Sequence, residues 1–205
     1  MGAPIASGGV IAVLGPDGSG KSTFADALVE GALEGERVVR LHHRPGRFVS
    51  RTPTGAPVTD PHGEAPYPRS LSIAKLLFLF ADFVVGWWTR VRPFVRGGGW
   101  VVWERPWWDI AIDPARYRLQ GCSTLARFLG RILPAPDLVI VLEAPVEVLL
   151  ARKREVSEIE LARQTGELRH VIPQRVRTLF LDSRASVETL VDQARSELHS
   201  LASPR

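Results

Sequence analysis

The stretch GPDGSGKS, residues 15–22, has the residue types and the spacing needed to bind phosphate groups. It fits the pattern G-x-x-x-x-G-K-[ST] at every required position, and it follows a short apolar run, GGVIAVLG. Glycines in such a turn let backbone N–H groups converge on phosphate oxygens, and the N-terminus of a following helix adds partial positive charge. We therefore expect this loop to bind the phosphates of a nucleoside triphosphate.

The side chains of this loop have separate expected roles. Lys21 is expected to bridge the β- and γ-phosphates of ATP as a catalytic residue, and the Ser22 hydroxyl is expected to ligate Mg²⁺. The residues expected to contact ATP are Gly15, Asp17, Gly18, Ser19, Gly20, Lys21, Ser22 and Thr23.

A second stretch, WVVWERPWWDI (100–110), surrounds one Glu-Arg pair with four tryptophans. Glu104 follows an apolar run, so it is expected at the carboxyl end of a strand, where it either binds a Mg²⁺ water or accepts a proton from an acceptor hydroxyl. The guanidinium of Arg105 is suited to stabilising charge on a transferred phosphoryl group. The alternative is an ion pair that only ends the strand.

A cluster of basic residues, ARKREVSEIELARQ (151–164), is the third candidate. We expect a lid at about 152–165, which closes over the triphosphate and excludes water. Arg152 is the expected catalytic contact and Arg154 a further ATP contact, with Arg163 the weaker candidate. Glutamates alternate with the basic residues, so a solvated helix face is the alternative.

The acceptor side of the site is less well defined by the sequence. Residues that could contact the acceptor follow the expected second and third strands: His43, Arg44, Trp107, Trp108 and Asp109. The two tryptophans could stack on a base or sugar ring, or they could pack in an aromatic core with Trp87 and Trp88. The segment DPARYR (113–118) could bind hydroxyls or phosphate, or be a turn held by an Asp-Arg pair.

The elements that must position these residues alternate between strand and helix. We expect strands at 8–15, 37–43, 100–103, 137–144 and 176–183, with helices at 21–35, 70–96, 122–133, from Pro145 onward and at 186–201. This order predicts a three-layer α/β fold of the P-loop NTPase type: a five-stranded parallel sheet, helices on both faces, and a short Arg-bearing lid. Residues 1–205 then form a single domain.

The segment between the second strand and the long helix, about 44–69, holds six prolines and three glycines with no periodicity. Such a long loop inside a compact domain is uncommon, so we expect it to be either functional or mobile.

Composition restricts the location and the partners of the chain. The single cysteine, Cys122, fits a reducing cytosol, and the N-terminus lacks a leader-like pattern, so we expect a cytoplasmic protein. The net charge is +4, but the arginines are scattered, which does not favour a nucleic-acid partner. The apolar segment 71–88 contains Lys75 and Asp82, so we expect a core helix and no membrane insertion.

The chain resembles the thymidylate kinase branch of the nucleoside monophosphate and deoxynucleoside kinases. The resemblance rests on GPDGSGKST, HHRPGR, WER and the stretches VRPFVRGGGWVVWERPWWDIAIDPARYR and LGRILPAPDLVIVLEAPVEVLLARK, and it spans about residues 9–190. It is closest to a thymidylate kinase-like subgroup often found among bacterial surface-polysaccharide genes. The resemblance implies an ATP- and Mg²⁺-dependent kinase of a small acceptor, and a homodimer through helix 70–96, although a buried core explains the same apolar face.

Departures from the family pattern bear on the acceptor. Pro106 and Asp109 stand where thymidylate kinases usually have Tyr and Ser, and Arg44 stands where the family has Glu. These differences disfavour thymidylate itself. The expected acceptor is a nucleotide or nucleoside; the alternatives are a sugar or glycan intermediate of surface-polysaccharide synthesis, and a non-catalytic ATP-binding sensor.

Overall fold

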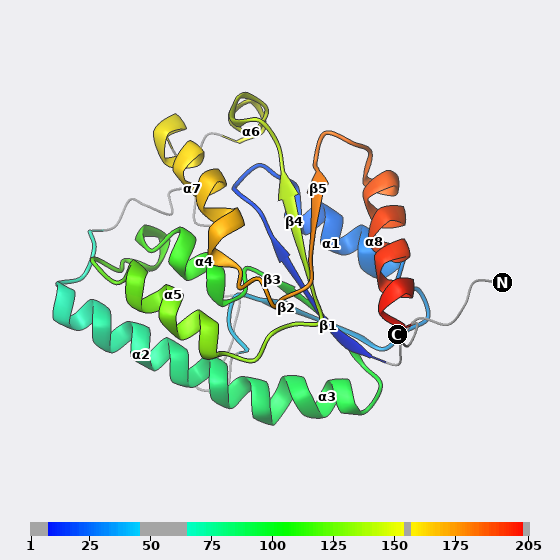
Figure 1. Cartoon of the computed structure of the whole chain (residues 1–205), viewed down its shortest axis with the longest axis horizontal. Coiled ribbons are helices and arrows are strands. Elements are labelled where there is room, and N and C mark those ends of the chain that lie inside the picture. Colours follow the sequence, from blue (N-terminus) through cyan, green and yellow to red (C-terminus); the bar gives the residue numbers. More distant parts are fainter. Residues whose placement is uncertain (1–7, 46–64, 154–156, 203–205) are drawn as a thin grey trace.

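The computed structural model describes residues 8–45, 65–153 and 157–202. Its centre is one sheet of five parallel strands in the order β2-β3-β1-β4-β5 (Figure 1). The strands are β1 (Gly9–Leu14), β2 (Val38–His42), β3 (Trp100–Glu104), β4 (Leu138–Glu143) and β5 (Thr178–Asp182). All five predicted strands are therefore confirmed, as is the parallel sheet.

Parallel pairing brings the carboxyl ends of the strands to one edge of the sheet. Glu104 of β3 lies in register with Val13 of the central strand β1 on one side and with His42 of the edge strand β2 on the other. The loop that follows β1 and the residues that follow β3 therefore emerge side by side. This edge is where all the strand-end candidates meet.

Helices cover both faces of the sheet (Figure 1). The helices are α1 (Lys21–Glu30), α2 (Arg69–Gly86), the π-helical turn η1 (Trp87–Val91), α3 (Arg92–Arg96), α4 (Trp107–Ile112), the 3₁₀ turn η2 (Ala115–Tyr117), α5 (Ser123–Ile132), α6 (Val146–Arg152), α7 (Glu158–Val171) and α8 (Val187–Ala202). Helices α1 and α8 pack on one face, and α2, α4, α5 and α7 bury apolar side chains on the other. A three-layer arrangement results.

The two tryptophans of β3 lie in different hydrophobic cores, one on each face of the sheet. Side chains along a strand alternate between its faces, so residues three positions apart point to opposite sides. Trp100 packs with the α1 and α8 side chains, whereas Trp103 packs with those of α2 and α4. Both indole rings are almost fully buried. These two residues therefore lie on opposite faces of the sheet.

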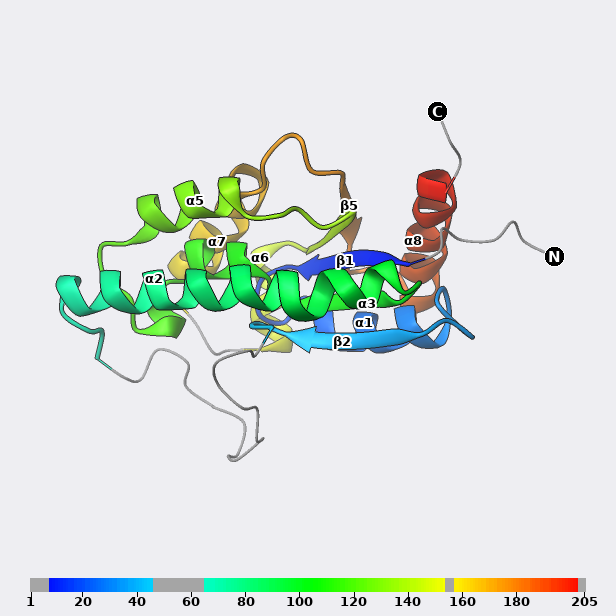
Figure 2. The same ribbon diagram turned by 90° about the horizontal axis from the view of Figure 1, so that it is seen from below.

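The long helix runs without a break from Arg69 to Arg96 as α2, η1 and α3 (Figure 2). Pro93 has no N–H for the carbonyl four residues earlier, and the π-helical turn at Trp87–Val91 widens the helix just before it. The helix ends at the glycine run, where Gly98 takes a φ of +81° that L-residues with a Cβ rarely adopt.

This helix is the one described helix that is long and apolar enough to cross a membrane, and only 33% of its most apolar window is buried. Its inner face nevertheless belongs to the core, because Leu76, Leu79 and Phe83 are almost fully enclosed and Asp82 is completely buried. Lys75 donates a hydrogen bond of 2.8 Å to the carbonyl of Tyr117. These contacts fit a helix that lies on a soluble domain.

Two regions differ from the sequence expectation in detail. The residues after the Glu-Arg pair form the short helix α4, whereas no helix is predicted there from the sequence. The predicted lid spans the end of α6, then residues 154–156, which lie outside the described part, and then the first half of α7. Most of the predicted Pro-rich loop, residues 46–64, likewise lies outside the described residues.

Candidate phosphate-binding and catalytic site

The loop of residues 15–20 joins β1 to α1, as the sequence predicts. Its turns need glycine: a Cβ on Gly15 would lie 2.6 Å from the Ser19 Oγ, and one on Gly18 would lie 2.8 Å from the Leu149 carbonyl oxygen. Helix α1 begins at Lys21, so its first backbone N–H groups, which have no partners within the helix, point toward the loop. Such an arrangement is suited to an anion.

The buried side chain of Lys21 folds back against this loop. Its ammonium group is buried and donates hydrogen bonds of 2.7 Å to the carbonyls of Gly15 and Pro16. Burial and the nearby guanidinium of Arg105 lower the pKa of Lys21 to about 8, against the attraction of Asp17. A buried cation of this kind favours the approach of an anion, because an anion restores the charge balance.

Ser22 and Glu104 meet across the sheet edge. The Ser22 hydroxyl donates a hydrogen bond of 2.8 Å to Glu104 Oε2, and the guanidinium of Arg40 pairs with the other oxygen and with Asp26. Burial raises the pKa of Glu104, but the hydrogen bonds from Arg40 and Ser22 outweigh it, so the pKa is lower than usual. Glu104 is therefore an ionised carboxylate next to the first turn of α1.

Asp17 ties the loop to the end of β3. Its buried carboxylate accepts a hydrogen bond of 2.6 Å from Arg105 and is also paired with Arg116. Although burial raises the pKa of Asp17, the charges of Lys21, Arg105 and Arg116 lower it to about 2. The loop carboxylate thus stays ionised and fixes two guanidinium groups beside loop 15–20.

Asp109 forms the other half of this network. It lies 3.4 Å from Arg105 and accepts a hydrogen bond of 2.6 Å from the Tyr117 hydroxyl. Burial raises the pKa of Asp109, but Arg105 and the Tyr117 hydroxyl bring it below its usual value. Arg105 is thereby held between two carboxylates, one from the loop and one from α4.

Two residues at neighbouring strand ends have left-handed backbone conformations, His43 with φ +65° and Arg105 with φ +51°. Such a conformation costs a non-glycine residue about 1–2 kcal/mol. Backbone hydrogen bonds hold both residues: His43 N–H donates to the Glu104 carbonyl at 2.8 Å, and Arg105 N–H donates to the Val13 carbonyl at 3.3 Å. The Trp103 indole also donates to the His43 carbonyl at 2.7 Å. Strained residues held in this way are concentrated at functional sites.

The His43 side chain lies against the network just described. Its ring stacks on Tyr117 with centroids 4.5 Å apart, and burial lowers the pKa of its imidazole to about 3. The ring is therefore neutral at pH 7. Arg44 follows at the same edge and is half-buried. Of the residues predicted to contact the acceptor, His43, Arg44 and Asp109 lie at this edge.

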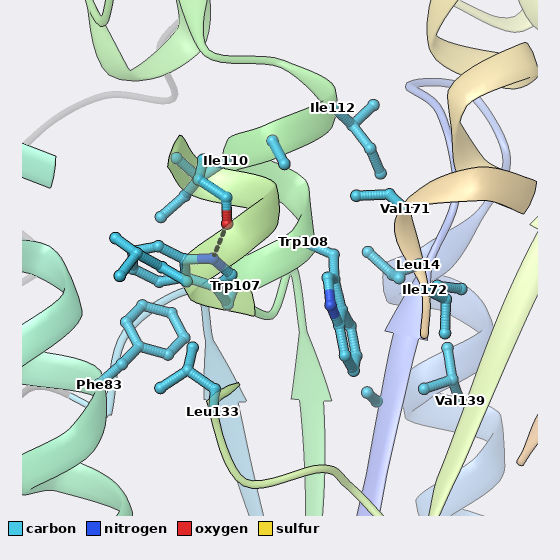
Figure 3. Packing of buried hydrophobic residues seen from close by; sticks show 14 of the residues in the cluster. Leu14, Phe83, Trp107, Trp108, Ile110, Ile112, Leu133, Val139, Val171 and Ile172 are labelled. Atoms are coloured by element: carbon cyan, nitrogen blue, oxygen red, sulfur yellow. Dashed lines mark hydrogen bonds between the residues drawn. The ribbon is translucent and has the colours of Figure 1, made fainter. Parts of the chain in front are cut away.

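Trp107 and Trp108 lie in the core instead (Figure 3). Trp107 meets Phe80 and Phe83 edge to face, and its indole donates a hydrogen bond of 2.8 Å to the Ala126 carbonyl. The exposed fractions of Trp107 and Trp108 are only 3% and 5%. Of the two alternatives left open by the sequence, the structure favours the aromatic core over a ring that lines the acceptor cleft. Trp87 packs against this core, as expected, but Trp88 is half exposed and lies outside it.

Arg152 lies at the end of α6, next to the phosphate-binding turn. Its guanidinium donates hydrogen bonds of 3.2 Å to the Ser183 hydroxyl and 3.0 Å to the Ser183 carbonyl. It borders a groove of about 310 Å³, whose lining also includes Gly18, Ser19, Gly20, Thr23, Ser183, Ala185 and Ser186. Arg152 and Thr23 therefore share one groove with the loop.

The other two arginines named for the predicted lid, Arg154 and Arg163, are not seen beside the loop as Arg152 is. Arg154 lies outside the described residues. Arg163 is paired with Glu160 and donates a hydrogen bond of 2.6 Å to the Ile112 carbonyl, so it links α7 to the end of α4. For Arg163, these contacts favour a structural role over contact with a triphosphate.

Three residues of the site were not predicted as site residues: Arg40, Tyr117 and Ser183. Arg116 was expected only as part of DPARYR, a segment that could bind hydroxyls or phosphate or form a turn. Arg40 could have been recognised from the sequence, because it is a charged residue inside the predicted strand segment VVRLH. The turn DPARYR does contain the expected Asp-Arg pair, with Arg116 and Asp113 3.2 Å apart, but Arg116 reaches Asp17 as well. Only tertiary structure reveals that second contact.

Comparison with known proteins adds no assignment: no protein-family model matches the chain, and the search of curated proteins found no match. The functional conclusion therefore rests on the sequence motifs and on the geometry of the site.

Proposed function

We propose that this chain is an ATP-dependent, Mg²⁺-dependent phosphotransferase of the P-loop kinase type, related to the thymidylate kinases. The observation that carries the proposal is the hydrogen bond from Ser22 to Glu104 directly behind a G-x-x-x-x-G-K-S loop. It joins the two residues expected to serve the metal, one from the loop and one from the neighbouring strand end. The cytoplasm is the proposed location, in keeping with the single buried Cys122.

In this proposal the loop and the start of α1 bind the triphosphate. Lys21, now directed at loop carbonyls 2.7 Å away, needs only a small rearrangement to meet β- and γ-phosphate oxygens. The groove beside Arg152, Ser183 and Thr23 offers room for the nucleoside part. Arg152 would then contact the nucleotide from the side opposite Glu104.

The residues present fit a magnesium ion. No group of three or more His, Cys, Asp or Glu side chains forms a metal site within the described ranges. Mg²⁺ needs no such cluster, because it is usually held by one or two protein oxygens together with phosphates and waters. Ser22 Oγ and the Glu104 carboxylate supply hard oxygen atoms of that kind. When bound, the ion would neutralise phosphate charge during transfer.

Between the two roles open to Glu104, its low pKa supports that of a ligand to a metal-bound water. A carboxylate held ionised by Arg40 and Ser22 is a weak proton acceptor. Arg105 has the complementary role: anchored by Asp17 and Asp109, it would present a fixed positive charge to the transferred group without reorganising.

The proposed acceptor is a small nucleotide or nucleoside. The stacked rings of His43 and Tyr117 and the carboxylate of Asp109 lie together at the acceptor edge, which suits a ring that carries hydroxyl groups. The same features suit a sugar or glycan intermediate of surface-polysaccharide synthesis, and that is the second candidate. An ATP-binding sensor without catalysis is the alternative from a different class.

A direct test incubates the protein with γ-labelled ATP, Mg²⁺ and a panel of thymidine, thymidylate, other nucleosides and free sugars. The proposal predicts label on one acceptor and loss of transfer when EDTA removes the metal. Binding of ATP without consumption of ATP, across the whole panel, would favour the sensor. The absence of both ATP binding and ATP consumption would refute the proposal.

A further inference from the structure

Charge is distributed unevenly along the chain. Residues 69–136 contain ten Arg or Lys and four acidic residues. All four acidic side chains are buried: Asp82, Glu104, Asp109 and Asp113 have exposed fractions between 0% and 6%. The surface contributed by this third of the chain therefore carries positive charge with no exposed carboxylate.

The same stretch carries most of the large apolar side chains that reach the surface. On the long helix these are Leu71, Leu77, Phe78 and Trp88, each about half exposed at 46–50%, and on α5 they are Phe128 and Ile132 at 57% and 59%. Helix α5 runs beside the first half of the long helix in both views (Figures 1 and 2). We call the exposed side of these two helices the apolar-basic face.

Arginines flank the apolar side chains of this face. Arg69 is exposed at the start of the long helix, Arg92 and Arg96 lie near its end, and Arg131 is exposed between Phe128 and Ile132. The guanidinium of Arg92 lies over the Trp88 ring, 4.2 Å from its centroid. An exposed tryptophan beside arginines, at the end of an apolar helix, is typical of a segment that lies in a membrane interface.

We propose that the apolar-basic face docks the protein on the surface of an anionic lipid bilayer. The apolar side chains would enter the headgroup region, and the arginines would pair with lipid phosphates and other anionic headgroups. The opposite side of the long helix supplies Leu76, Leu79 and Phe83 to the core, so the helix lies along the bilayer instead of crossing it. This proposal is independent of the chemistry proposed for the site.

Charge complementarity favours a lipid surface over a second copy of the chain. If two copies paired through this face, arginines at both ends of one long helix would meet arginines of the other. Neither the long helix nor α5 has an exposed carboxylate to compensate, because their one acidic residue, Asp82, is buried. Like charges brought together in an interface oppose association. An anionic bilayer supplies the missing negative charge.

The test is flotation of the full chain with vesicles of phosphatidylcholine alone or mixed with phosphatidylglycerol, at low and high salt. We expect binding to the anionic vesicles only, weakened by salt. Among the six tryptophans, all in the described part, Trp88 is the exposed one, so its fluorescence should shift to the blue on binding, and the shift should vanish in Trp88→Phe.

Two pairs of variants separate the apolar and the basic contributions. Leu77→Gln with Trp88→Gln should weaken binding by about tenfold or more, whereas Ile159→Gln, 85% exposed on α7, should not. Arg92→Gln with Arg96→Gln should weaken it by about 25-fold, at about fivefold per arginine. The matched control is Arg184→Gln with Arg195→Gln, two exposed arginines outside this face.

Several outcomes overturn the proposal. One is equal binding to neutral and anionic vesicles, or binding to neither. Another is unchanged binding in the arginine variant, which keeps every apolar residue of the fold. A third is a dimer in analytical ultracentrifugation that Trp88→Gln converts to a monomer while vesicles remain unbound; the face would then be an interface between copies.

Discussion

The Ser22 hydroxyl donates a hydrogen bond of 2.8 Å to Glu104, although the two residues are 82 positions apart. Ser22 lies in the first turn of α1, after loop 15–20, and Glu104 ends the neighbouring strand β3. Their contact follows from the parallel register of β1 and β3, which aligns Val13 with Glu104.

Replacing Glu104 by Gln should lower turnover by about a hundredfold or more, because the amide removes the negative charge needed near Mg²⁺. ATP binding, measured by calorimetry without an acceptor, should stay close to that of the parent. Glu143→Gln is the matched control, since Glu143 ends β4 but pairs with Arg169. Full turnover in Glu104→Gln would remove this residue from the mechanism.

Replacing Arg152 by Ala should lower turnover by about a hundredfold, as loss of one fixed donor to developing charge does elsewhere. Arg152→Lys should restore little, because a single ammonium cannot make both hydrogen bonds that the guanidinium makes to Ser183. Steady-state kinetics with varied ATP measures both variants. Arg169→Ala, an exposed arginine on α7, should behave like the parent.

Replacing Asp17 by Ala should destabilise the fold by about 3–5 kcal/mol, because it leaves Arg105 and Arg116 without their shared buried partner. Urea denaturation followed by circular dichroism gives the change in the free energy of unfolding. Asp182→Ala removes a solvent-exposed pair with Arg184 and should have a much smaller effect. Equal effects of the two substitutions would contradict the network described for Asp17.

His43 should make the fold less stable as the pH falls. Its pKa is 6.5 when unfolded and about 3 when folded, so below pH 6.5 the unfolded chain binds a proton that the folded chain does not. Stability from this group is complete above pH 6.5 and is lost progressively toward pH 3. Between pH 6.5 and 4.5, before the carboxylates of the unfolded chain titrate, this effect should be separable.

The measurement is the free energy of unfolding across that pH range for the parent and for His43→Asn. Asparagine tolerates the left-handed backbone at this position but does not titrate. The slope with pH should flatten in His43→Asn and persist in His170→Asn, which removes an exposed imidazole on α7. An unchanged slope in His43→Asn would show that this imidazole is not the source.

Trp107 should behave as a core residue. Trp107→Ala should lower the free energy of unfolding by about 3–5 kcal/mol, because it removes the packing against Phe80 and Phe83. The half-exposed Trp88 serves as the control, and its replacement by Ala should have a much smaller effect on unfolding. For the folded fraction of Trp107→Phe, the KM for the acceptor should match that of the parent; a large rise would place the indole in the acceptor site.

Strand and helix order, and the position of the loop at 15–22, could be predicted from sequence because those features are local. Apolar runs of strand length, a Gly-rich turn and a helical pattern each depend on neighbouring residues. The order β2-β3-β1-β4-β5 is not local, since it depends on which strands pair, and it is this order that places Glu104 beside the loop.

The division between site and core also required the fold. Trp107 and Trp108 stand within four residues of Arg105, yet α4 turns both indole rings into the core and directs Asp109 to Arg105. Successive side chains of an α-helix point in directions about 100° apart around its axis. A shift of one residue in where α4 starts would therefore change which side chains face the site.

By itself the sequence determined a Gly-rich G-x-x-x-x-G-K-S loop between a strand and a helix, and an alternating α/β chain, because both depend on residue types at fixed short spacing. Tertiary structure decided which distant charges meet: Ser22 with Glu104, and Asp17 with Arg105 and Arg116. Such pairs form because buried charges need partners, and the available partners are those that the parallel sheet brings to the same edge.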